Sequence, residues 1–183
     1  MAVNLHAPEF LHPVAGVRLG IAEAAIKKPG RKDLLLIELA PGSRVAGTFT
    51  RNAFCAAPVQ LCRESLAHGV EIRALLINSG NANAGTGAGG LADARATQAA
   101  VAQALGCSAE QVLPFSTGVI GQRLPVERVT AAVPSAVTGL RGDAWLDAAA
   151  AIMTTDTVMK GATRKVATSQ GEVTVTGIAK GAG

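Results

Sequence analysis

The sequence predicts an α/β protein with mixed sheets, in which helices pack on layers of strands. The first observation is composition: 183 residues, 49% hydrophobic and 16% charged, are enough to bury a core and are unlike a disordered chain. The second is that strand-like apolar segments are interspersed with helix-like ones. The third is that aromatic residues make up only 3%, so the core must be stabilised by close packing of Ala, Val, Leu and Ile.

The first third of the chain is predicted to be a β-meander. Two turn-forming segments, KKPGRK at 27–32 and PGSR at 41–44, separate apolar runs of strand length. The predicted strands span 17–26, 33–40 and 45–50. We interpret the basic segment 27–32 as a solvated hairpin turn, because a nucleic-acid surface would add aromatic platforms or a basic helix face.

Helices and strands alternate over the rest of the chain. A helix at 58–68 has Pro58 in its first turn and Gly69 as its stop, and the strand at 71–78 is apolar enough to be buried on both faces. A strong helix at 91–105 follows. We further predict a capping box from Ser108 to Gln111, a strand at 112–116, a helix from Val126 that is interrupted near Pro134, a helix with Asp143 as its N-cap, and a C-terminal hairpin at 164–183.

The glycine-rich segment between the strand at 71–78 and the helix at 91–105 contains a G-x-G-x-x-G spacing. Gly85, Gly87 and Gly90 match the turn that holds the pyrophosphate of a dinucleotide. In that motif the first glycine leaves the strand directly, whereas here the turn-forming SGNANA intervenes. The acidic residue that would bind a ribose hydroxyl is also missing after the next strand. We therefore favour a functional loop at the end of a strand over a nucleotide site.

Three polar segments at the ends of elements are candidates for chemistry. Thr117 and Gly118 end the strand at 112–116 and place a hydroxyl beside a backbone N–H, the pair of donors that a developing oxyanion needs. Thr154 lies in the polar end of an alanine-rich helix, and Lys180 lies between small residues at the end of a strand. Each also has an ordinary structural interpretation, as a turn, a helix terminus or a solvated lysine, and spacing alone does not separate the two.

Charge and cysteine content exclude several classes of protein. The net charge of +4 is spread along the chain, which favours a small anionic substrate over a nucleic acid. The three cysteines form no C-x-x-C pair and the three histidines are scattered, so we expect no disulfide framework and no metal site. The first ten residues lack the pattern of a signal peptide and no apolar run has membrane-spanning length, so a cytoplasmic protein is expected.

Five motifs together point to a known family. In chain order they are TRNAFCAAPV at 50–59, INSGNANAGTG at 77–87, FSTGVIG at 115–121, AIMTTDT at 151–157 and VTGIAKGAG at 175–183. With these motifs the chain resembles the N-terminal α chain of the glutamate N-acetyltransferase family of arginine biosynthesis, whose members are also called ornithine acetyltransferases. The resemblance covers nearly the whole chain and does not depend on any one motif.

The resemblance implies a fold, a reaction and a partner. The fold would be a layered α/β/β/α sandwich with mixed sheets, of the ornithine acetyltransferase/β-aminopeptidase kind and similar to N-terminal-nucleophile hydrolases. Members cut their own precursor before a Thr, which becomes the nucleophile at the start of a β chain. An acetyl group moves from N-acetyl-L-ornithine to that Thr and then to L-glutamate, and some members also use acetyl-CoA. Residues 1–183 would then be an α chain, one part of a domain that the β chain completes, in an α2β2 heterotetramer without a bound cofactor.

Carried over by motif, the functional residues of the family fall on the four candidate positions. Thr117 and Gly118 match the oxyanion hole, through the Thr hydroxyl and the Gly N–H, and Thr154 and Lys180 match substrate-binding residues. The nucleophilic Thr is expected on the β chain, since no Thr of this sequence matches it. The glycine-rich segment is a motif of the family in its own right, so it is not expected to bind a dinucleotide.

Two other functions stay open as alternatives: a self-cleaving aminopeptidase of related fold, and a non-enzymatic nucleotide-binding module that uses the glycine-rich segment. The motifs at 151–157 and 175–183 argue against the aminopeptidase. The binding module would need no partner chain that begins with Thr. Acceptance of acetyl-CoA is left open, because selectivity for glutamate and for CoA is expected to involve the β chain.

Overall fold

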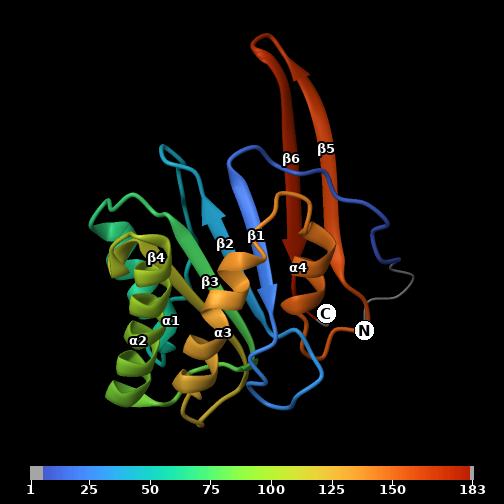
Figure 1. Ribbon diagram of the computed structural model, residues 1–183. Helices are drawn as coiled ribbons and strands as arrows, with labels where there is room; N and C mark the ends of the chain where they lie inside the picture. The colour runs from blue at the N-terminus through green and yellow to red at the C-terminus, as the bar shows by residue number, and fades with distance from the viewer. Residues whose placement is uncertain (1–5, 182–183) are drawn as a thin grey trace.

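The computed structural model describes residues 6–181, which form a four-stranded mixed sheet, a long two-stranded hairpin and four α-helices (Figure 1). The four-stranded sheet consists, in spatial order, of β1 (Val17–Ala22), β2 (Leu34–Leu39), β3 (Ala74–Asn81) and β4 (Val112–Val119). The hairpin consists of β5 (Lys160–Thr168) and β6 (Gly171–Ala179). The helices are α1 (Ala57–Ala67), α2 (Gly87–Leu105), α3 (Val126–Thr138) and α4 (Trp145–Ala151), and a short 3-10 helix spans Ala109–Gln111.

The direction of the strands decides which ends meet. β2 is antiparallel to both β1 and β3, and β4 is parallel to β3, with α2 as the crossover between them. The ends of β1, β3 and β4 therefore lie at the same edge of the sheet as the start of β2. In Figure 1 this is the lower edge, and β6 also runs toward it. Open α/β sheets bind ligands at such an edge, where strands end and loops begin.

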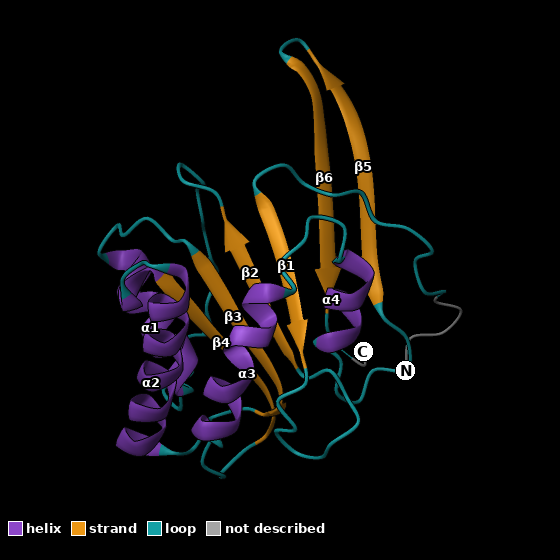
Figure 2. Cartoon of the chain, in the orientation of Figure 1, coloured by secondary structure: helices purple, strands orange, loops and turns teal. Residues whose placement is uncertain are grey.

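The two faces of the four-stranded sheet are covered differently (Figure 2). One face carries α2 and α3, whose buried residues pack on Leu34, Leu36 and Leu76. On the other face α4 packs on Leu19 and Leu35, and α1 covers only the part near β4. Between α1 and α4 this second face is hollowed into an apolar groove.

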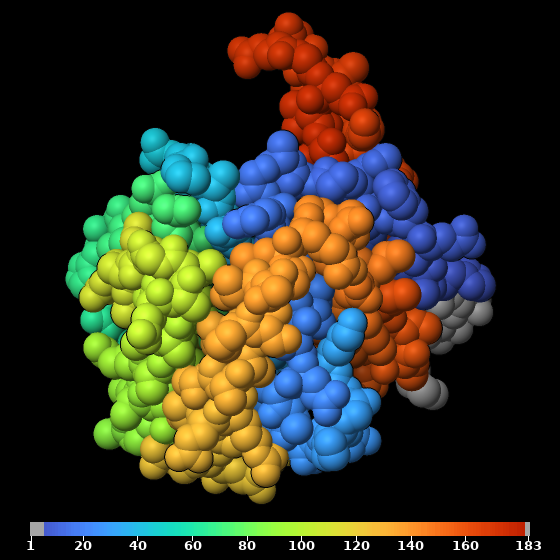
Figure 3. Space-filling model, in the orientation of Figure 1, coloured from blue at the N-terminus to red at the C-terminus, as the bar shows by residue number. Residues whose placement is uncertain are grey.

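The hairpin of β5 and β6 stands out from the body of the protein (Figure 3). Its base is held by the N-terminal segment: the His12 N–H donates to Thr163 Oγ1 at 3.2 Å, and the Thr176 hydroxyl donates to the His12 carbonyl at 2.8 Å. Toward the tip three large apolar side chains are exposed: Val166, Val173 and Val175. The described residues thus anchor the hairpin but leave its apolar outer part uncovered.

Most of the predicted elements are confirmed, with ends that shift by a few residues. The helix predicted at 58–68 is α1, and the strand predicted at 112–116 is β4, which continues to Val119. The capping box from Ser108 to Gln111 is present. The C-terminal hairpin predicted at 164–183 is the hairpin of β5 and β6, and the last two residues of that prediction, 182 and 183, lie outside the described residues. Among residues 6–181 no helix is both long and apolar enough to cross a bilayer.

Three predictions about these elements are wrong. The segment 45–50 is not a strand, because both edges of β2 are already paired, with β1 and with β3. α3 is not interrupted at Pro134. The proline removes one N–H from the helix ladder, but it lies on the exposed side, and packing of the buried side holds the helix on both sides of it. α4 is not capped by Asp143, whose carboxylate instead accepts a hydrogen bond from Arg141 at 3.0 Å.

β1 is also shorter than predicted, for a reason that matters for the site. It stops at Ala22 instead of residue 26. The carboxylate of Asp33 accepts the N–H groups of Ala24 and Ile26, each at 2.7 Å, and so draws these residues away from the strand ladder. The chain between β1 and β2 therefore becomes a shaped loop.

Candidate active site

The four residues predicted to form the site line a single cavity of about 570 Å³. Thr117 and Gly118 belong to the end of β4, Thr154 follows α4, and Lys180 follows β6. The volume is within the range of small-ligand pockets. Residues that sequence reasoning missed complete the wall: Lys27, Lys28, Arg31 and Asp33 from the β1–β2 loop, and Ser79 and Gly80 from β3.

Backbone geometry requires glycine at position 118. β3 and β4 run in register until a bulge at Gly80 and Asn81, where the ladder shifts. Gly118 has a φ of +139°, and a Cβ at this position would lie 2.3 Å from the carbonyl carbon of Gly80. The absence of side chains lets the two strand ends approach closely. Thr117 and the backbone of Gly118 are thereby held at the cavity wall.

Asp156 fixes the two segments that carry Thr154 and Lys180. Its side chain is 1% exposed, and its carboxylate accepts the Thr154 N–H at 3.1 Å, the Gly181 N–H at 2.6 Å and the Lys160 ammonium at 2.9 Å. Burial opposes ionisation, but these hydrogen bonds and the charge of Lys160 outweigh it and hold the pKa of Asp156 below its usual range. One carboxylate therefore joins Thr154 to the residue that follows Lys180.

Arg31 ties the end of α4 to β3. Its Nη2 donates to Ser79 Oγ at 3.2 Å and to the carbonyl oxygen of Met153. Ser79, which is 1% exposed, donates from its hydroxyl to the Ala151 carbonyl at 2.8 Å. These contacts hold the chain just before Thr154 against the strand that pairs with β4. The guanidinium of Arg31 thus combines a structural contact with a place in the cavity wall.

Positive charge predominates in the cavity. Four cationic side chains line it, from Lys27, Lys28, Arg31 and Lys180, against the single carboxylate of Asp33. Over the part of the chain that the structure describes, none of these cations forms an ion pair with a carboxylate. The prediction of an exposed turn at 27–32 holds for Lys27 and Lys28, but it missed that these two residues and Arg31 line the cavity. The turn lies at the edge of the sheet where β1, β3 and β4 end. This position depends on segments distant in sequence, so it cannot be predicted from the residues of the turn alone.

The glycine-rich segment is a packed joint between β3 and α2. Asn83 is fully buried; its side-chain amide donates to the Gly90 carbonyl and its Oδ1 accepts the Thr86 hydroxyl, both at 2.8 Å. A Cβ on Gly90 would lie 1.9 Å from Thr86 Oγ1. Gly87 and Gly90 already belong to α2, so protein groups fill the space at the first turn of this helix. This packing accounts for Gly90, and the positive φ values of Gly85 and Gly87, +71° and +57°, account for the other two glycines without a nucleotide.

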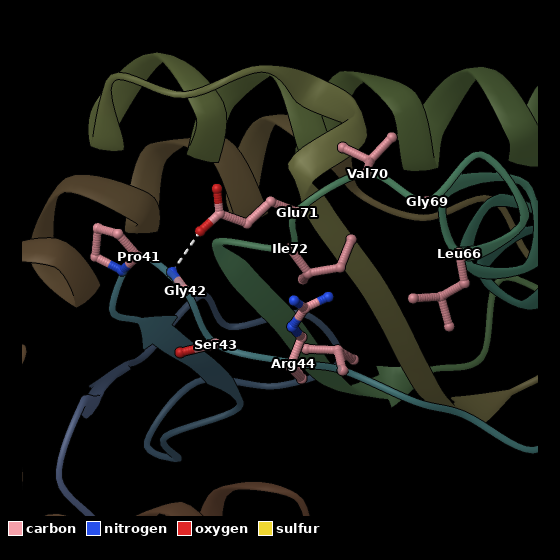
Figure 4. A pocket seen from close by; sticks show the side chains of 10 residues that line it. Pro41, Gly42, Ser43, Arg44, Leu66, Gly69, Val70, Glu71 and Ile72 are labelled. Atoms are coloured by element: carbon pink, nitrogen blue, oxygen red, sulfur yellow. Dashed lines mark hydrogen bonds between the residues drawn. The ribbon is translucent and has the colours of Figure 1, made fainter.

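Two other hollows have a different character. The apolar groove on the open face of the sheet has a volume of about 490 Å³ and meets the site at Thr117 and Lys180, which line both cavities. A third hollow, of about 570 Å³, lies at the opposite end of β2 and β3, where the Glu71 carboxylate accepts the Gly42 N–H at 2.6 Å (Figure 4). It contains none of the four predicted site residues.

Cys62 and Cys107 are not suited to nucleophilic chemistry. Burial raises the pKa of the Cys62 thiol to about 12, and its sulfur lies 3.2 Å from the Pro114 carbonyl oxygen. Burial also raises the pKa of Cys107. Within residues 6–181, His, Cys, Asp and Glu side chains form no group of three or more that could hold a metal ion. What the described side chains and backbone offer a ligand is positive charge and hydrogen-bond donors.

The fold and the cavity together define a class of protein. An α/β sheet whose strand ends converge on a cavity with cations, a hydroxyl and glycine backbone is typical of an enzyme for a small anionic substrate. Sequence comparison gives the family. The chain belongs to the ArgJ family, whose family model matches residues 18–183.

Two solved structures are similar over most of their length. Ornithine acetyltransferase from Mycobacterium tuberculosis, in complex with ornithine, is 41% identical with a TM-score of 0.84, and the match covers 98% of this chain and 94% of that one. The arginine biosynthesis bifunctional protein ArgJ from Bacillus halodurans is 34% identical with a TM-score of 0.82, covering 93% of this chain and 88% of that one. These similarities confirm the predicted α/β fold class with mixed sheets, the predicted family, and the prediction of an acetyltransferase of arginine biosynthesis.

Proposed function

We propose that this chain transfers an acetyl group from N-acetyl-L-ornithine to L-glutamate, together with a β chain from the same precursor that supplies a nucleophilic N-terminal Thr. The observation that carries the proposal is the convergence of Thr117, Gly118, Thr154 and Lys180 on one cavity, although they come from three separate segments of the chain. The similarity to an ornithine acetyltransferase in complex with ornithine supports the choice of substrate.

The reaction consists of two acyl transfers. In the first, the hydroxyl oxygen of the β-chain Thr bonds to the acetyl carbon of N-acetylornithine, and the carbonyl oxygen becomes an oxyanion that accepts hydrogen bonds from the Thr117 hydroxyl and the Gly118 N–H. The C–N bond then breaks, and ornithine leaves with the proton of the Thr hydroxyl. In the second, the amine nitrogen of glutamate bonds to the acetyl carbon, the ester C–O bond breaks, and the Thr oxygen takes up the proton that the amine loses, which releases N-acetylglutamate. Each oxyanion donor contributes about a hundredfold to a thousandfold in kcat.

Thr154 and Lys180 bind the amino-acid part of the substrate in this scheme. Lys180 lines both the site and the apolar groove, and its ammonium can neutralise a carboxylate. The position of Thr154 is fixed through its N–H by Asp156, which leaves its hydroxyl to donate to substrate. Pre-positioned groups of this kind lower the entropic cost of reaching the transition state.

The β chain is proposed to cover the open face of the sheet. The groove between α1 and α4 is lined by Ile37, Leu75, Ile77 and Phe115, and it opens into the site at Thr117. An uncovered apolar face of this kind favours association with another chain. A β chain seated there would bring a nucleophile to the oxyanion donors, and two such pairs would form an α2β2 heterotetramer.

The proposal is tested with the protein expressed from its uncut precursor. Purified complex is incubated with N-acetylornithine and glutamate, and formation of N-acetylglutamate and ornithine is followed by mass spectrometry. We expect equimolar products, ping-pong kinetics, and one added acetyl group on the β chain when glutamate is omitted. An active complex whose β chain never carries acetyl would refute the acetyl-Thr intermediate.

A parallel reaction supplies acetyl-CoA in place of N-acetylornithine. N-acetylglutamate formed from acetyl-CoA and glutamate would establish a second acetyl donor, with acetyl-CoA as a co-substrate and CoA as the product. Its absence would restrict the enzyme to recycling the acetyl group. The Thr117→Ala variant is the control in both reactions, because it removes an oxyanion donor and leaves Lys180 in place.

A further inference from the structure

We propose that the loop between β1 and β2 binds the α-carboxylate of the amino-acid substrates, through Lys27 and Lys28 with the support of Arg31. The proposal rests on the function proposed above and assigns a carboxylate subsite to residues outside the family motifs. It would make this loop a determinant of specificity, since N-acetylornithine and glutamate both carry a carboxylate one carbon from the nitrogen that holds or receives the acetyl group.

The loop has a built conformation. Asp33 is only 3% exposed. Its two carboxylate oxygens accept the backbone N–H groups of Ala24 and Ile26 in the loop, at 2.7 Å each. From α3, Arg128 donates to the Ala25 carbonyl at 2.7 Å. The chain is therefore fixed immediately before Lys27. A loop held in this way can present cations without ordering them anew on binding.

Lys27 approaches the oxyanion donors through two glycines. A Cβ on Gly80 would lie 3.3 Å from Lys27 Cβ, and one on Gly118 would lie 2.3 Å from the carbonyl carbon of Gly80. The loop, the end of β3 and the end of β4 are thus stacked in direct contact. A side chain at position 80 would push the loop away from Thr117, so glycine there keeps the basic residues next to the acyl-transfer groups.

The electrostatics of the loop favour an anionic ligand. Both oxygens of Asp33 are already bound by backbone N–H groups, and over residues 6–181 no carboxylate forms an ion pair with Lys27 or Lys28. Arg31 is held in place by uncharged partners, Ser79 and the Met153 carbonyl, and within residues 6–181 it forms no ion pair with a carboxylate. Charge-assisted hydrogen bonds to a carboxylate are the interactions these groups can add.

Geometry favours the carboxylate of an amino acid over a phosphate of CoA. The basic loop shares one cavity with Thr117 and Gly118, so an anion bound there lies next to the acyl carbon. In N-acetylornithine the carboxylate and the acetylated nitrogen are attached to the same carbon. In acetyl-CoA, by contrast, a long pantetheine arm separates the phosphates from the thioester. A carboxylate bound by the loop would therefore orient the scissile amide toward the oxyanion donors.

The test compares Lys27→Met and Lys28→Met with Lys32→Met in the assembled α/β protein. Lys32 belongs to the same basic turn, carries the same charge and is exposed like Lys27 and Lys28, but it does not line the cavity. We expect each cavity variant to raise the KM for N-acetylornithine and for glutamate about tenfold or more, the size of a charge-assisted hydrogen bond. Turnover should change much less, and the Lys32→Met enzyme should match the unmodified one.

A second substrate makes the test specific for the carboxylate. N-acetylornithine amide lacks the negative charge, so the unmodified enzyme should use it poorly, and the Lys27→Met and Lys28→Met variants should discriminate less between acid and amide. Unchanged KM values in both variants, undiminished discrimination, or an effect confined to acetyl-CoA would each overturn the proposal.

Failure of the proposed function gives a different result. An unmodified complex that transfers no acetyl group at all contradicts the proposed reaction. Calorimetric titration can still measure the affinity for N-acetylornithine and so test whether the loop binds its carboxylate. Binding that weakens in Lys27→Met but not in Lys32→Met would support the subsite without the reaction. Equal binding by all three proteins would overturn the subsite.

Discussion

Replacement of Asp156 tests whether one buried carboxylate holds the site together. In Asp156→Ala three donors lose their acceptor: the N–H groups of Thr154 and Gly181, and the ammonium of Lys160, whose side chain is only 16% exposed. Removing one member of a buried ion pair costs about 3–5 kcal/mol, because the other charge is left without a partner. We expect a loss of that size in the free energy of unfolding. Asp156→Asn keeps one acceptor oxygen and should lose about 1–3 kcal/mol.

The effect should depend on pH with a defined sign. The pKa of Asp156 is depressed in the folded protein, so its carboxylate stabilises the fold above the unfolded pKa of about 3.9, and this contribution is lost as the pH falls below that value. The difference in unfolding free energy between the unmodified protein and Asp156→Asn should therefore be constant from about pH 5 to pH 8. It should shrink progressively below about pH 4.

Urea denaturation of the assembled protein, followed by circular dichroism across this pH range, measures both quantities. The matched control is Glu172→Gln, which removes the carboxylate of an exposed ion pair with Lys165 at 2.8 Å and should cost less than about 1 kcal/mol. Asp156→Asn should also lower kcat/KM for N-acetylornithine, because Thr154 and Lys180 lose their common anchor, whereas Glu172→Gln should not. Equal losses in the two variants, or a difference independent of pH, would refute this account of Asp156.

Substitutions at three further positions test the predicted site residues in the acetyl-transfer assay. Thr117→Ala should lower kcat by roughly a hundredfold while Thr117→Ser retains much of it; unchanged turnover in a folded Ala variant removes this residue from the site. Lys180→Ala should impair transfer and Lys180→Arg should restore little, since a guanidinium is bulkier and fork-shaped; full activity in the Ala variant would make this lysine merely solvated. Gly118→Ala should abolish activity and lower the melting temperature, because its Cβ would lie 2.3 Å from Gly80; a fully active, stable variant would contradict the reported strand geometry.

Local sequence patterns predicted the elements that end in glycine or begin with proline. α1 starts with Pro58 in its first turn and stops at Gly69, and α2 ends at Gly106, which has a φ of +67°. These signals act over a few residues, so they can be read from sequence. The positions of Thr117 and Lys180 at strand ends were predictable in a similar way, because each residue follows a strand-like segment and directly precedes a glycine.

Contacts between segments distant in sequence were not predictable in this way. The basic turn at 27–32 has the composition of a solvated loop, and its place in the cavity depends on Gly80, about fifty residues later in the chain. Arg31 reaches Met153, which is further still. The failed strand at 45–50 has the same origin, because the partners of β2 are decided by β3. Periodicity describes which face of an element is buried, but not which element covers it.

Two buried carboxylates explain how distant segments form one cavity in a chain whose core has few large side chains. Asp33 and Asp156 each accept two backbone N–H groups from the chain around them, and each thereby shapes a segment that faces the same space. Asp33 shapes the loop that carries the basic residues of the cavity, and Asp156 joins the segments of Thr154 and Lys180. A buried carboxylate costs free energy unless its oxygens accept hydrogen bonds. Conformations of the segment in which the N–H groups no longer reach the carboxylate are therefore disfavoured. Small aliphatic residues can pack in several ways, and it is these directional contacts that restrict the cavity to one arrangement.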